Sequence, residues 1–421
     1  MVKTEYYKDL TKMNTFGMKV KARCFIEYDS VADLVDIEFE ELARPVLHIG
    51  GGSNLLFTDD FKGTILHSKI NFIEILEDCQ QVNESPIRHC EEQGDVVQST
   101  KLLEQSERIS SPVLVSVGAG VVFDDFCAWA AKEGLWGVEN LSYIPGEVGA
   151  SAVQNIGAYG VEVKDVIKTV YCYDTVEEEF VNFDVKDLGY GYRDSAFKDP
   201  EIKGRYIVTH VVFALSRTPQ PKLDYGHLKE AVASFVSPSS DPRPATASLS
   251  HPVAGQHPKN QQIPGDSGGG MSLTCDTNSA MEKPLTPAVI RKAIIKIRKE
   301  KLPEPSVMGS AGSFFKNPVI SAEHFAKIEA AAKAELGSDY KVPHYDLPDG
   351  TVKVPAAWLI EQCGWKGKRS GGAAVYDKQP LVIVNYTGDA YPEEIVGLER
   401  RIIASVKAKF DIELHPEVEH I

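Results

Sequence analysis

The fold prediction depends most on one run of small residues, Ile144-Pro-Gly-Glu-Val-Gly-Ala-Ser-Ala-Val-Gln-Asn-Ile-Gly-Ala-Tyr-Gly160. It contains four glycines, three alanines and one serine, and it has no lysine or arginine. Small side chains at this density allow a large flat ligand to lie against the backbone. Close packing between two elements is the alternative. The length of the run and its Gln154-Asn155 pair favour the ligand site.

A second glycine-rich segment lies upstream, directly after a run that is typical of a strand. It reads Ile49-Gly-Gly-Gly-Ser-Asn-Leu-Leu-Phe57. Three glycines allow positive φ and a close approach of backbone N–H groups to an anion, which is how a chain holds a diphosphate. A tight turn explains the same residues. The segment matches neither G-x-G-x-x-G nor a Walker loop, so no Rossmann fold is indicated.

Composition excludes several classes of protein. The chain has 421 residues and a net charge of -15, which argues against a nucleic-acid binder. The polar N-terminus lacks the apolar stretch of a secretory signal, and no window reaches the roughly 18 apolar residues of a membrane span. The seven cysteines form no C-x-x-C pair. We therefore expect no metal site, no disulfide framework and a cytoplasmic location.

The first half of the chain predicts a mixture of helices and strands. Helices are expected at about 31–43, capped by Ser30, and at about 124–133, ended by Gly134. Strands are expected at 46–49, 64–68, 72–76, 113–117, 166–173 and 206–215. No repeat is visible, so the fold class is α+β.

Two stretches interrupt this pattern. Residues 77–110 are polar and acidic, and residues 234–287 hold 8 of the 24 prolines. The second stretch has too few large apolar residues to offset its chain entropy, so we expect a flexible insertion, with an ordered irregular loop as the alternative.

The last third of the chain predicts a second α+β module. It begins with a basic amphipathic helix from Thr286-Pro287 to about 299. Further helices are expected from Ser321 to Gly337, from Pro355 to Gly364 and over about 392–409. A strand is expected at 381–385, and the last helix leads into an extended run at 412–418.

Three polar residues in separate segments are candidates for chemistry. Arg193 lies in Gly189-Tyr-Gly-Tyr-Arg-Asp-Ser-Ala-Phe-Lys198 and could polarise a carboxylate or an enolate. Ser313 lies in Gly309-Ser-Ala-Gly-Ser-Phe-Phe-Lys-Asn-Pro318 without a neighbouring histidine, which favours a proton donor over a nucleophile. Glu417 lies in a strand-like run. Taken singly, an ion pair, a turn serine and a surface glutamate remain open.

Taken together, these segments resemble the UDP-N-acetylenolpyruvoylglucosamine reductase family. Further matching runs are Asn14-Thr-Phe-Gly17, Gly137-Val-Glu-Asn-Leu141, Gly371-Gly-Ala-Ala-Val375 and Pro416-Glu-Val418, and all occur in the family's order. The Gly-Tyr-Arg-Asp-Ser motif and Leu223-Asp-Tyr-Gly-His227 are similar to the longer subtype, in which a tyrosine loop closes over the substrate.

The resemblance implies a fold with an FAD-binding part of the vanillyl-alcohol-oxidase type and a C-terminal α+β substrate-binding domain. The FAD-binding subdomains would occupy residues 1–70 and 71–230, and the second would contain the 77–110 insertion. The flexible insertion would occupy 231–287 and the substrate-binding domain 288–411. A C-terminal strand at 412–421 would return to the active site.

The resemblance also implies the function and its residues. NADPH would reduce FAD, and the enolpyruvyl group of UDP-N-acetylglucosamine enolpyruvate would then receive a hydride and a proton in peptidoglycan precursor synthesis. Arg193, Ser313 and Glu417 would be catalytic, and the sugar nucleotide would contact Tyr225, Lys301, Asn317 and Gln379. FAD would contact Gly50, Gly51, Gly52, Ser53, Asn54, Leu55, Pro145, Gly146, Gly149, Ala150, Ser151, Asn155, Gly157, Ala158 and Tyr159.

Two other functions remain open from the sequence. One is a different FAD oxidase or dehydrogenase of the same superfamily. The other is a non-catalytic module that binds a flavin or a sugar nucleotide. We expect a monomer.

Overall fold

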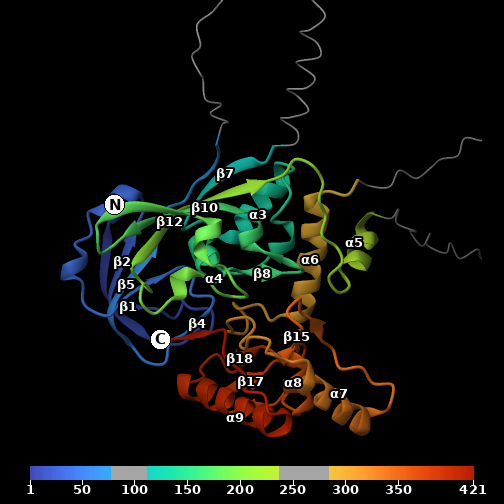
Figure 1. Cartoon of the computed structure of the whole chain (residues 1–421). Helices are drawn as coiled ribbons and strands as arrows, with labels where there is room; N and C mark the ends of the chain where they lie inside the picture. Colours follow the sequence, from blue (N-terminus) through green and yellow to red (C-terminus); the bar gives the residue numbers. More distant parts are fainter. Residues whose placement is uncertain (77–110, 237–283) are drawn as a thin grey trace, which may run out of the picture.

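A computed structural model describes residues 1–76, 111–236 and 284–421 (Figure 1). The expected insertion at 77–110 lies outside the described residues. Most of the expected insertion at 234–287 lies outside them as well. The described elements form two sheets in the N-terminal half and a helix-rich C-terminal part below them in Figure 1.

The first sheet carries the first glycine-rich segment. Its strands lie in the order β1 (Lys3–Asp9), β2 (Lys21–Tyr28), β5 (Phe61–Ser68) and β3 (Val46–Ile49). β1 is antiparallel to β2, whereas β2 and β3 are both parallel to β5. The glycines therefore follow β3 at its carboxyl end, and β4 (Leu55–Leu56) comes next. The expected strands at 46–49 and 64–68 are confirmed.

The helix expected at 31–43 is wrong in length. Ser30 caps α1 (Val31–Val35) by accepting a hydrogen bond from the backbone of Asp33, but α1 ends there and a short 3-10 turn follows at 39–41. Ile37 and Phe39 are both buried. Residues two apart lie on opposite sides of an α-helix, so one helix could not bury both side chains in the same core.

The second sheet is antiparallel throughout. Its order is β11 (Glu179–Asp184), β10 (Ile167–Asp174), β12 (Tyr206–Leu215), β7 (Val113–Gly118) and β6 (Ile73–Ile75). The strands expected at 72–76, 113–117, 166–173 and 206–215 correspond to β6, β7, β10 and β12. α3 (Phe123–Lys132) shares the core of this sheet and is followed by Gly134 with φ of +70°, as expected.

The small-residue run forms α4 (Val148–Gln154) and the hairpin of β8 (Gly157–Ala158) and β9 (Val161–Glu162). A Cβ on Gly149 would lie 2.9 Å from the Cβ of Ala119. Gly149 is therefore needed for close packing of α4, while its neighbours face a cleft described below. Both explanations of the run therefore apply.

Residues 231–236, expected in the flexible insertion, instead end a helix. α5 (Leu228–Val236) packs on α6 (Pro287–Lys301), and Leu228 and Val232 are buried against Ile290 and Ile294. The spacing of four residues places Leu228 and Val232 on one helical face. α6 begins at Pro287 as expected, and Thr286 caps it by accepting a hydrogen bond from Val289.

The C-terminal part contains two small sheets and three helices. β13 (Val319–Ser321), β15 (Thr351–Lys353) and β14 (Tyr345–Asp346) form one sheet, and β16 (Arg369–Ser370), β17 (Ala373–Val375) and β18 (Ile383–Asn385) form the other. α7 (Ala322–Leu336) is capped by Ser321, α8 (Ala356–Gln362) follows Pro355, and α9 (Pro392–Phe410) is the longest of the three. The helix starts expected at 321, 355 and 392 are confirmed.

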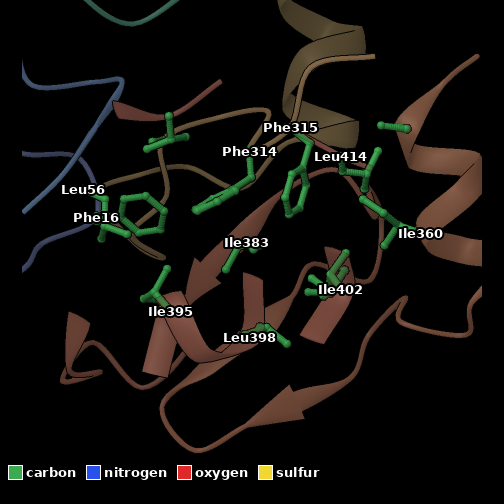
Figure 2. Packing of buried hydrophobic residues seen from close by; sticks show 14 of the residues in the cluster. Phe16, Leu56, Phe314, Phe315, Ile360, Ile383, Ile395, Leu398, Ile402 and Leu414 are labelled. Atoms are coloured by element: carbon green, nitrogen blue, oxygen red, sulfur yellow. The ribbon is translucent and has the colours of Figure 1, made fainter. Parts of the chain in front are cut away.

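One apolar core joins this part to the first sheet. Figure 2 shows Phe16 and Leu56 from the N-terminal region packed beside Phe314, with Ile383 and Ile395 below them. Fully burying each such side chain contributes about 1.5–3 kcal/mol. The expected extended run at 412–418 forms no strand of its own. β19 (Glu419–His420) pairs in parallel with β4, which brings the C-terminal segment beside the first glycine loop.

Candidate active site

A cleft of about 1520 Å³ lies between the two sheets and the C-terminal part. Its volume exceeds the range of about 300–1,000 Å³ that is usual for one small ligand. Every residue that we expected at the site lines the cleft, with the exception of Asn155. The lining includes Gly50–Leu55, Pro145, Gly146, Gly149, Ala150, Ser151, Gly157, Ala158, Tyr159, Arg193, Tyr225, Lys301, Ser313, Asn317, Gln379 and Glu417.

The two glycine-rich segments face each other across one end of the cleft. The hydroxyl of Ser53 donates a hydrogen bond to the carbonyl of Pro145 at 3.1 Å. Gly146 has a φ of +119°, and a Cβ there would lie 2.9 Å from the Ser53 hydroxyl oxygen. Both walls therefore present backbone and not side chains to the cleft. Backbone N–H groups can then approach the diphosphate of an extended dinucleotide closely. These residues fit FAD.

Asn155 lies beneath the cleft instead of lining it. It is fully buried, and its amide donates hydrogen bonds to the carbonyl of Gly191 at 2.7 Å and to the carboxylate of Glu162 at 3.1 Å. Its side-chain oxygen accepts from the backbone of Lys164. The expected direct contact of Asn155 with FAD is therefore not supported, because both ends of the amide are bound to protein.

Arg193 and Glu417 form an ion pair although 224 positions separate them. The Arg193 Nε–Glu417 Oε1 distance is 2.7 Å. The two Nη groups donate to the carbonyls of Asn155 and Gly157, at 3.3 and 2.7 Å. Arg193 also has a φ of +56°, which is uncommon for a residue with a side chain. The guanidinium is thus fixed at the cleft by three acceptors.

Ser313 lies in the segment that pairs with the segment carrying Glu417. The backbone N–H of Glu417 donates to the carbonyl of Phe314 at 2.8 Å, so the segments around 314 and 417 run side by side. The Ser313 side chain is half-buried and lines the cleft. Its hydroxyl has no hydrogen-bond partner within 1–76, 111–236 and 284–421, and it is therefore available to a ligand.

The four residues expected to contact a sugar nucleotide lie on different elements of the cleft. Lys301 ends α6 and is exposed. Asn317 accepts a hydrogen bond from the first residue of α8 and donates one to the Tyr192 hydroxyl at 3.3 Å. Tyr225 stacks on Tyr345, with the two rings 6.3 Å apart and nearly parallel. Gln379 lies in the turn before β18 and is half-buried.

Several residues of the cleft were missed by the sequence analysis. Lys353 lies 4.8 Å above the ring of Tyr192 and 5.6 Å above that of Tyr345. Arg298 donates to the carbonyl of Tyr143 at 3.0 Å, and burial lowers the pKa of its guanidinium. Burial, followed by the charge of a neighbouring lysine, lowers the pKa of Lys198. The basic face of the helix at 287–299 was the only signal that pointed to Arg298.

Comparisons with known proteins place this cleft in a flavoprotein. Residues 82–179, of which 82–110 lie outside the described part, match the family model for an FAD-binding domain. The chain is therefore an FAD-dependent oxidoreductase of the class that the sequence resemblance implied. The α+β fold class with an FAD-binding part is confirmed.

The particular family follows from a second family model and two related sequences, and a solved structure shares the fold. Residues 304–421 match the family model for the UDP-N-acetylenolpyruvoylglucosamine reductase C-terminal domain. The reductase of this name from Bacteroides fragilis is 42% identical, over 98% of this chain and 98% of its own length. The one from Neisseria meningitidis serogroup A is 38% identical, over 98% of this chain and 96% of its own length. The crystal structure of the Thermus caldophilus reductase aligns with a TM-score of 0.54 at 19% identity, over 100% of this chain and 98% of its own. The chain belongs to the UDP-N-acetylenolpyruvoylglucosamine reductase family.

Proposed function

We propose that the chain reduces UDP-N-acetylglucosamine enolpyruvate to UDP-N-acetylmuramate with NADPH, through FAD, in peptidoglycan precursor synthesis. Membership of the family over nearly the whole chain supports the reaction. The main supporting observation is that the Arg193–Glu417 ion pair and the free hydroxyl of Ser313 line the same cleft as the two glycine loops. The large cleft volume supports a site for both a dinucleotide and a sugar nucleotide.

FAD would lie along Gly50–Leu55 and the small residues of the 145–159 run. When bound, FAD would supply the chemistry of hydride transfer from NADPH to the vinyl carbon of the substrate. The glycine loops contribute backbone N–H groups for its diphosphate, and Gly157 and Ala158 leave room for a flat ring system.

Arg193 would stabilise the negative charge that builds on the substrate carboxylate and the adjacent carbon. Its guanidinium is fixed before substrate arrives, because Glu417 and the carbonyl of Gly157 each hold it at 2.7 Å. A fixed donor of this kind contributes about 3–4 kcal/mol in the transition state. Glu417 acts on the reaction by fixing the orientation of Arg193.

Ser313 would deliver the proton to that carbon. A serine hydroxyl is a weak acid, and it suffices here only because an enolate-like carbon is strongly basic and the donor is held in place. Phe314, which is fully buried, anchors the backbone next to Ser313. Tyr225, Lys301, Asn317 and Gln379 would hold the sugar nucleotide, with Lys301 as the cation for its diphosphate.

Anaerobic spectroscopy of the purified protein tests the function. We expect a flavin absorbance spectrum that NADPH bleaches and that UDP-N-acetylglucosamine enolpyruvate restores. Turnover with oxygen but not with the sugar nucleotide would indicate another oxidase of the superfamily. A yellow protein that NADPH leaves unbleached would indicate a binding module without catalysis.

A cytoplasmic location is part of the same proposal. The cysteines within the described ranges, Cys24, Cys127, Cys172 and Cys363, are free thiols, which supports a reducing compartment. In the same ranges no helix is long and apolar enough to cross a membrane.

A further inference from the structure

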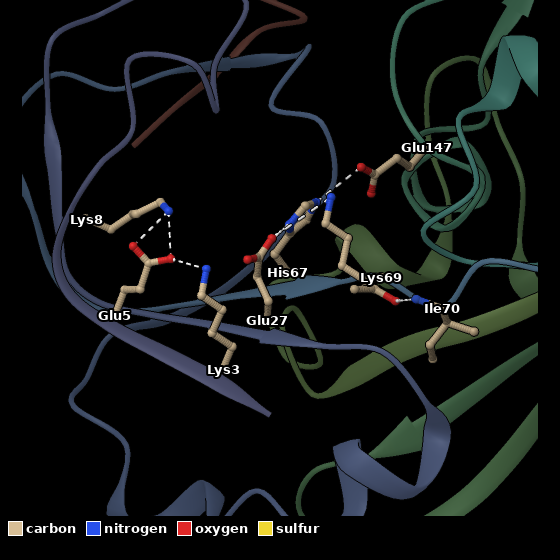
Figure 3. Close-up of polar contacts among 9 residues, drawn as sticks. Lys3, Glu5, Lys8, Glu27, His67, Lys69, Ile70 and Glu147 are labelled. Atoms are coloured by element: carbon tan, nitrogen blue, oxygen red, sulfur yellow. Dashed lines mark hydrogen bonds and ion pairs between the residues drawn. The ribbon is translucent and has the colours of Figure 1, made fainter. Parts of the chain in front are cut away.

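A chain of polar contacts lies behind the two glycine loops. Glu147, from the 145–147 loop, places Oε1 at 3.2 Å from Nε2 of His67 on β5. The other ring nitrogen, Nδ1, lies 3.2 Å from Oε1 of Glu27 on β2. Figure 3 shows the imidazole between the two carboxylates. Lys69 Nζ lies 4.0 Å from the same Glu27 oxygen.

Glu147 faces the cleft, whereas Glu27 and Lys69 do not line it. Its side chain is nine-tenths buried, yet the residue lines the cleft. A Cβ on Gly50 would lie 3.1 Å from Oε2, so this oxygen lies directly against the first glycine loop. Oε2 accepts no hydrogen bond from any residue in the described ranges, and it carries no dashed line in Figure 3.

Solvent in the cleft can reach Oε2, but a ligand that displaces this solvent must supply a hydrogen-bond donor in its place. Burying a charged oxygen without a hydrogen bond is costly, and a carboxylate can only accept. It cannot bind a phosphate oxygen, which is also an acceptor. The part of a dinucleotide that adjoins the diphosphate on either side is a sugar or sugar alcohol with free hydroxyls. These hydroxyls are the donors that fit Oε2.

We propose that Glu147 binds a hydroxyl of the flavin cofactor, on its ribityl chain or its ribose, and that His67 is the positioning residue that turns the carboxylate toward it. His67 is 2% exposed and lies on a central strand, so its ring is held rigidly. The imidazole binds Oε1 and leaves Oε2 for the ligand. The proposal rests on the proposed use of FAD.

Ligand binding to flavin-free protein tests the contact. We expect Glu147→Ala to weaken FAD binding by about 10-fold or more, because it removes a hydrogen bond to a charged group. The FAD affinity of Glu147→Gln should lie between those of the wild type and Glu147→Ala. FAD is titrated by quenching of its fluorescence. Separate titrations with FMN, which carries only the ribityl hydroxyls, and with ADP, which carries only the ribose, identify the hydroxyl.

A matched control separates binding from folding. Glu139 is also a buried glutamate, it accepts a hydrogen bond from Gly137 at 2.6 Å, and it does not line the cleft. Glu139→Gln is expected to lower the melting temperature while leaving FAD affinity within about twofold. Circular dichroism of each flavin-free variant identifies any that fails to fold, and Glu147→Gln keeps the shape of the side chain.

A double-mutant cycle tests the role of His67. If His67 acts through Glu147, His67→Ala weakens FAD binding and adds no further loss to Glu147→Ala. Fully additive losses would overturn the positioning role. Unchanged FAD affinity in Glu147→Ala, or tighter binding by Glu147→Gln than by the wild type, would overturn the contact itself. Wild-type protein that binds no FAD would instead refute the proposed function.

Discussion

Substitution of Gly157 tests whether the absence of one side chain sets the position of Arg193. A Cβ at residue 157 would lie 2.9 Å from Nη1 of Arg193, 3.0 Å from the carbonyl oxygen of Val161 and 3.1 Å from Cγ of Glu162. The Val161 carbonyl belongs to the β8–β9 hairpin, so we expect the guanidinium to move, at the expense of its three hydrogen bonds. Restoring an ordinary contact of 3.4 Å from 2.9 Å requires a shift of at least 0.5 Å.

That shift is expected to slow the chemistry more than it destabilises the fold. A displacement of about 1 Å in a reacting group can cost about 100-fold in rate, so Gly157→Ala should slow reoxidation of the reduced flavin by substrate about 10- to 100-fold. In free energy this is about 1.4–2.7 kcal/mol of barrier. The cost in stability should stay near 1 kcal/mol, since alanine also reduces the entropy of the unfolded chain.

Stopped-flow absorbance measures the two half-reactions separately, and thermal unfolding measures stability. Reduction of the flavin by NADPH should change less than its reoxidation by substrate. Gly397→Ala is the matched control, because Gly397 lies in α9 and a Cβ there would meet no atom within 4 Å. Wild-type reoxidation in Gly157→Ala would refute the idea that the backbone of Gly157 positions Arg193.

Three further changes have distinct expected outcomes. Ser313→Ala should leave bleaching by NADPH intact and slow reoxidation by substrate by about 10²–10⁴-fold in stopped flow, and equal loss in both half-reactions would exclude a proton donor. Asn54→Ala removes a 3.0 Å hydrogen bond to the carbonyl of Glu417 and should lower the free energy of unfolding in urea by about 1 kcal/mol; an unchanged midpoint would contradict this. Hydrogen bonds from Arg205 lower the pKa of Asp174. The ionised carboxylate therefore stabilises the fold above its unfolded pKa of about 3.9, and this stabilisation is lost as the pH falls through the folded pKa. Asp174→Asn should therefore lower the melting temperature at neutral pH, and the difference from wild type should shrink in acid; a difference that does not change with pH would show that the ion pair is not responsible.

Local signals predicted the helix starts well. Thr286 and Ser321 cap α6 and α7. Each side chain accepts a hydrogen bond from the backbone N–H three residues later, so a short stretch of sequence is enough to predict the cap. Elements that depend on distant partners were harder to predict. Residues 231–236 of α5 were assigned to a flexible insertion because the residues that follow them are polar and rich in proline. The four-residue spacing of Leu228 and Val232 is a weak signal by itself, and its meaning becomes clear only from the contact with α6.

The members of the candidate site could be predicted from motifs, but most of their contacts could not. The sequence does not say that Arg193 pairs with Glu417 instead of the adjacent Asp194, because that choice depends on how β19 returns to β4. Glu147 lies within the small-residue run, and the sequence indicates no role for it. Its relation to His67 depends on how the loop before α4 lies against the first sheet, and no local pattern encodes that contact.

The behaviour of Asn155 explains why the small-residue run serves two purposes. Its amide holds the carbonyl of Gly191, and its own carbonyl accepts from Arg193. The left-handed backbone of Arg193 costs energy, and such a conformation persists only where the surroundings determine it. Asn155 and Gly157 together provide those surroundings. The run that lines the cleft therefore also fixes the arginine, so a change meant to affect cofactor binding at 155 or 157 should alter the chemistry as well.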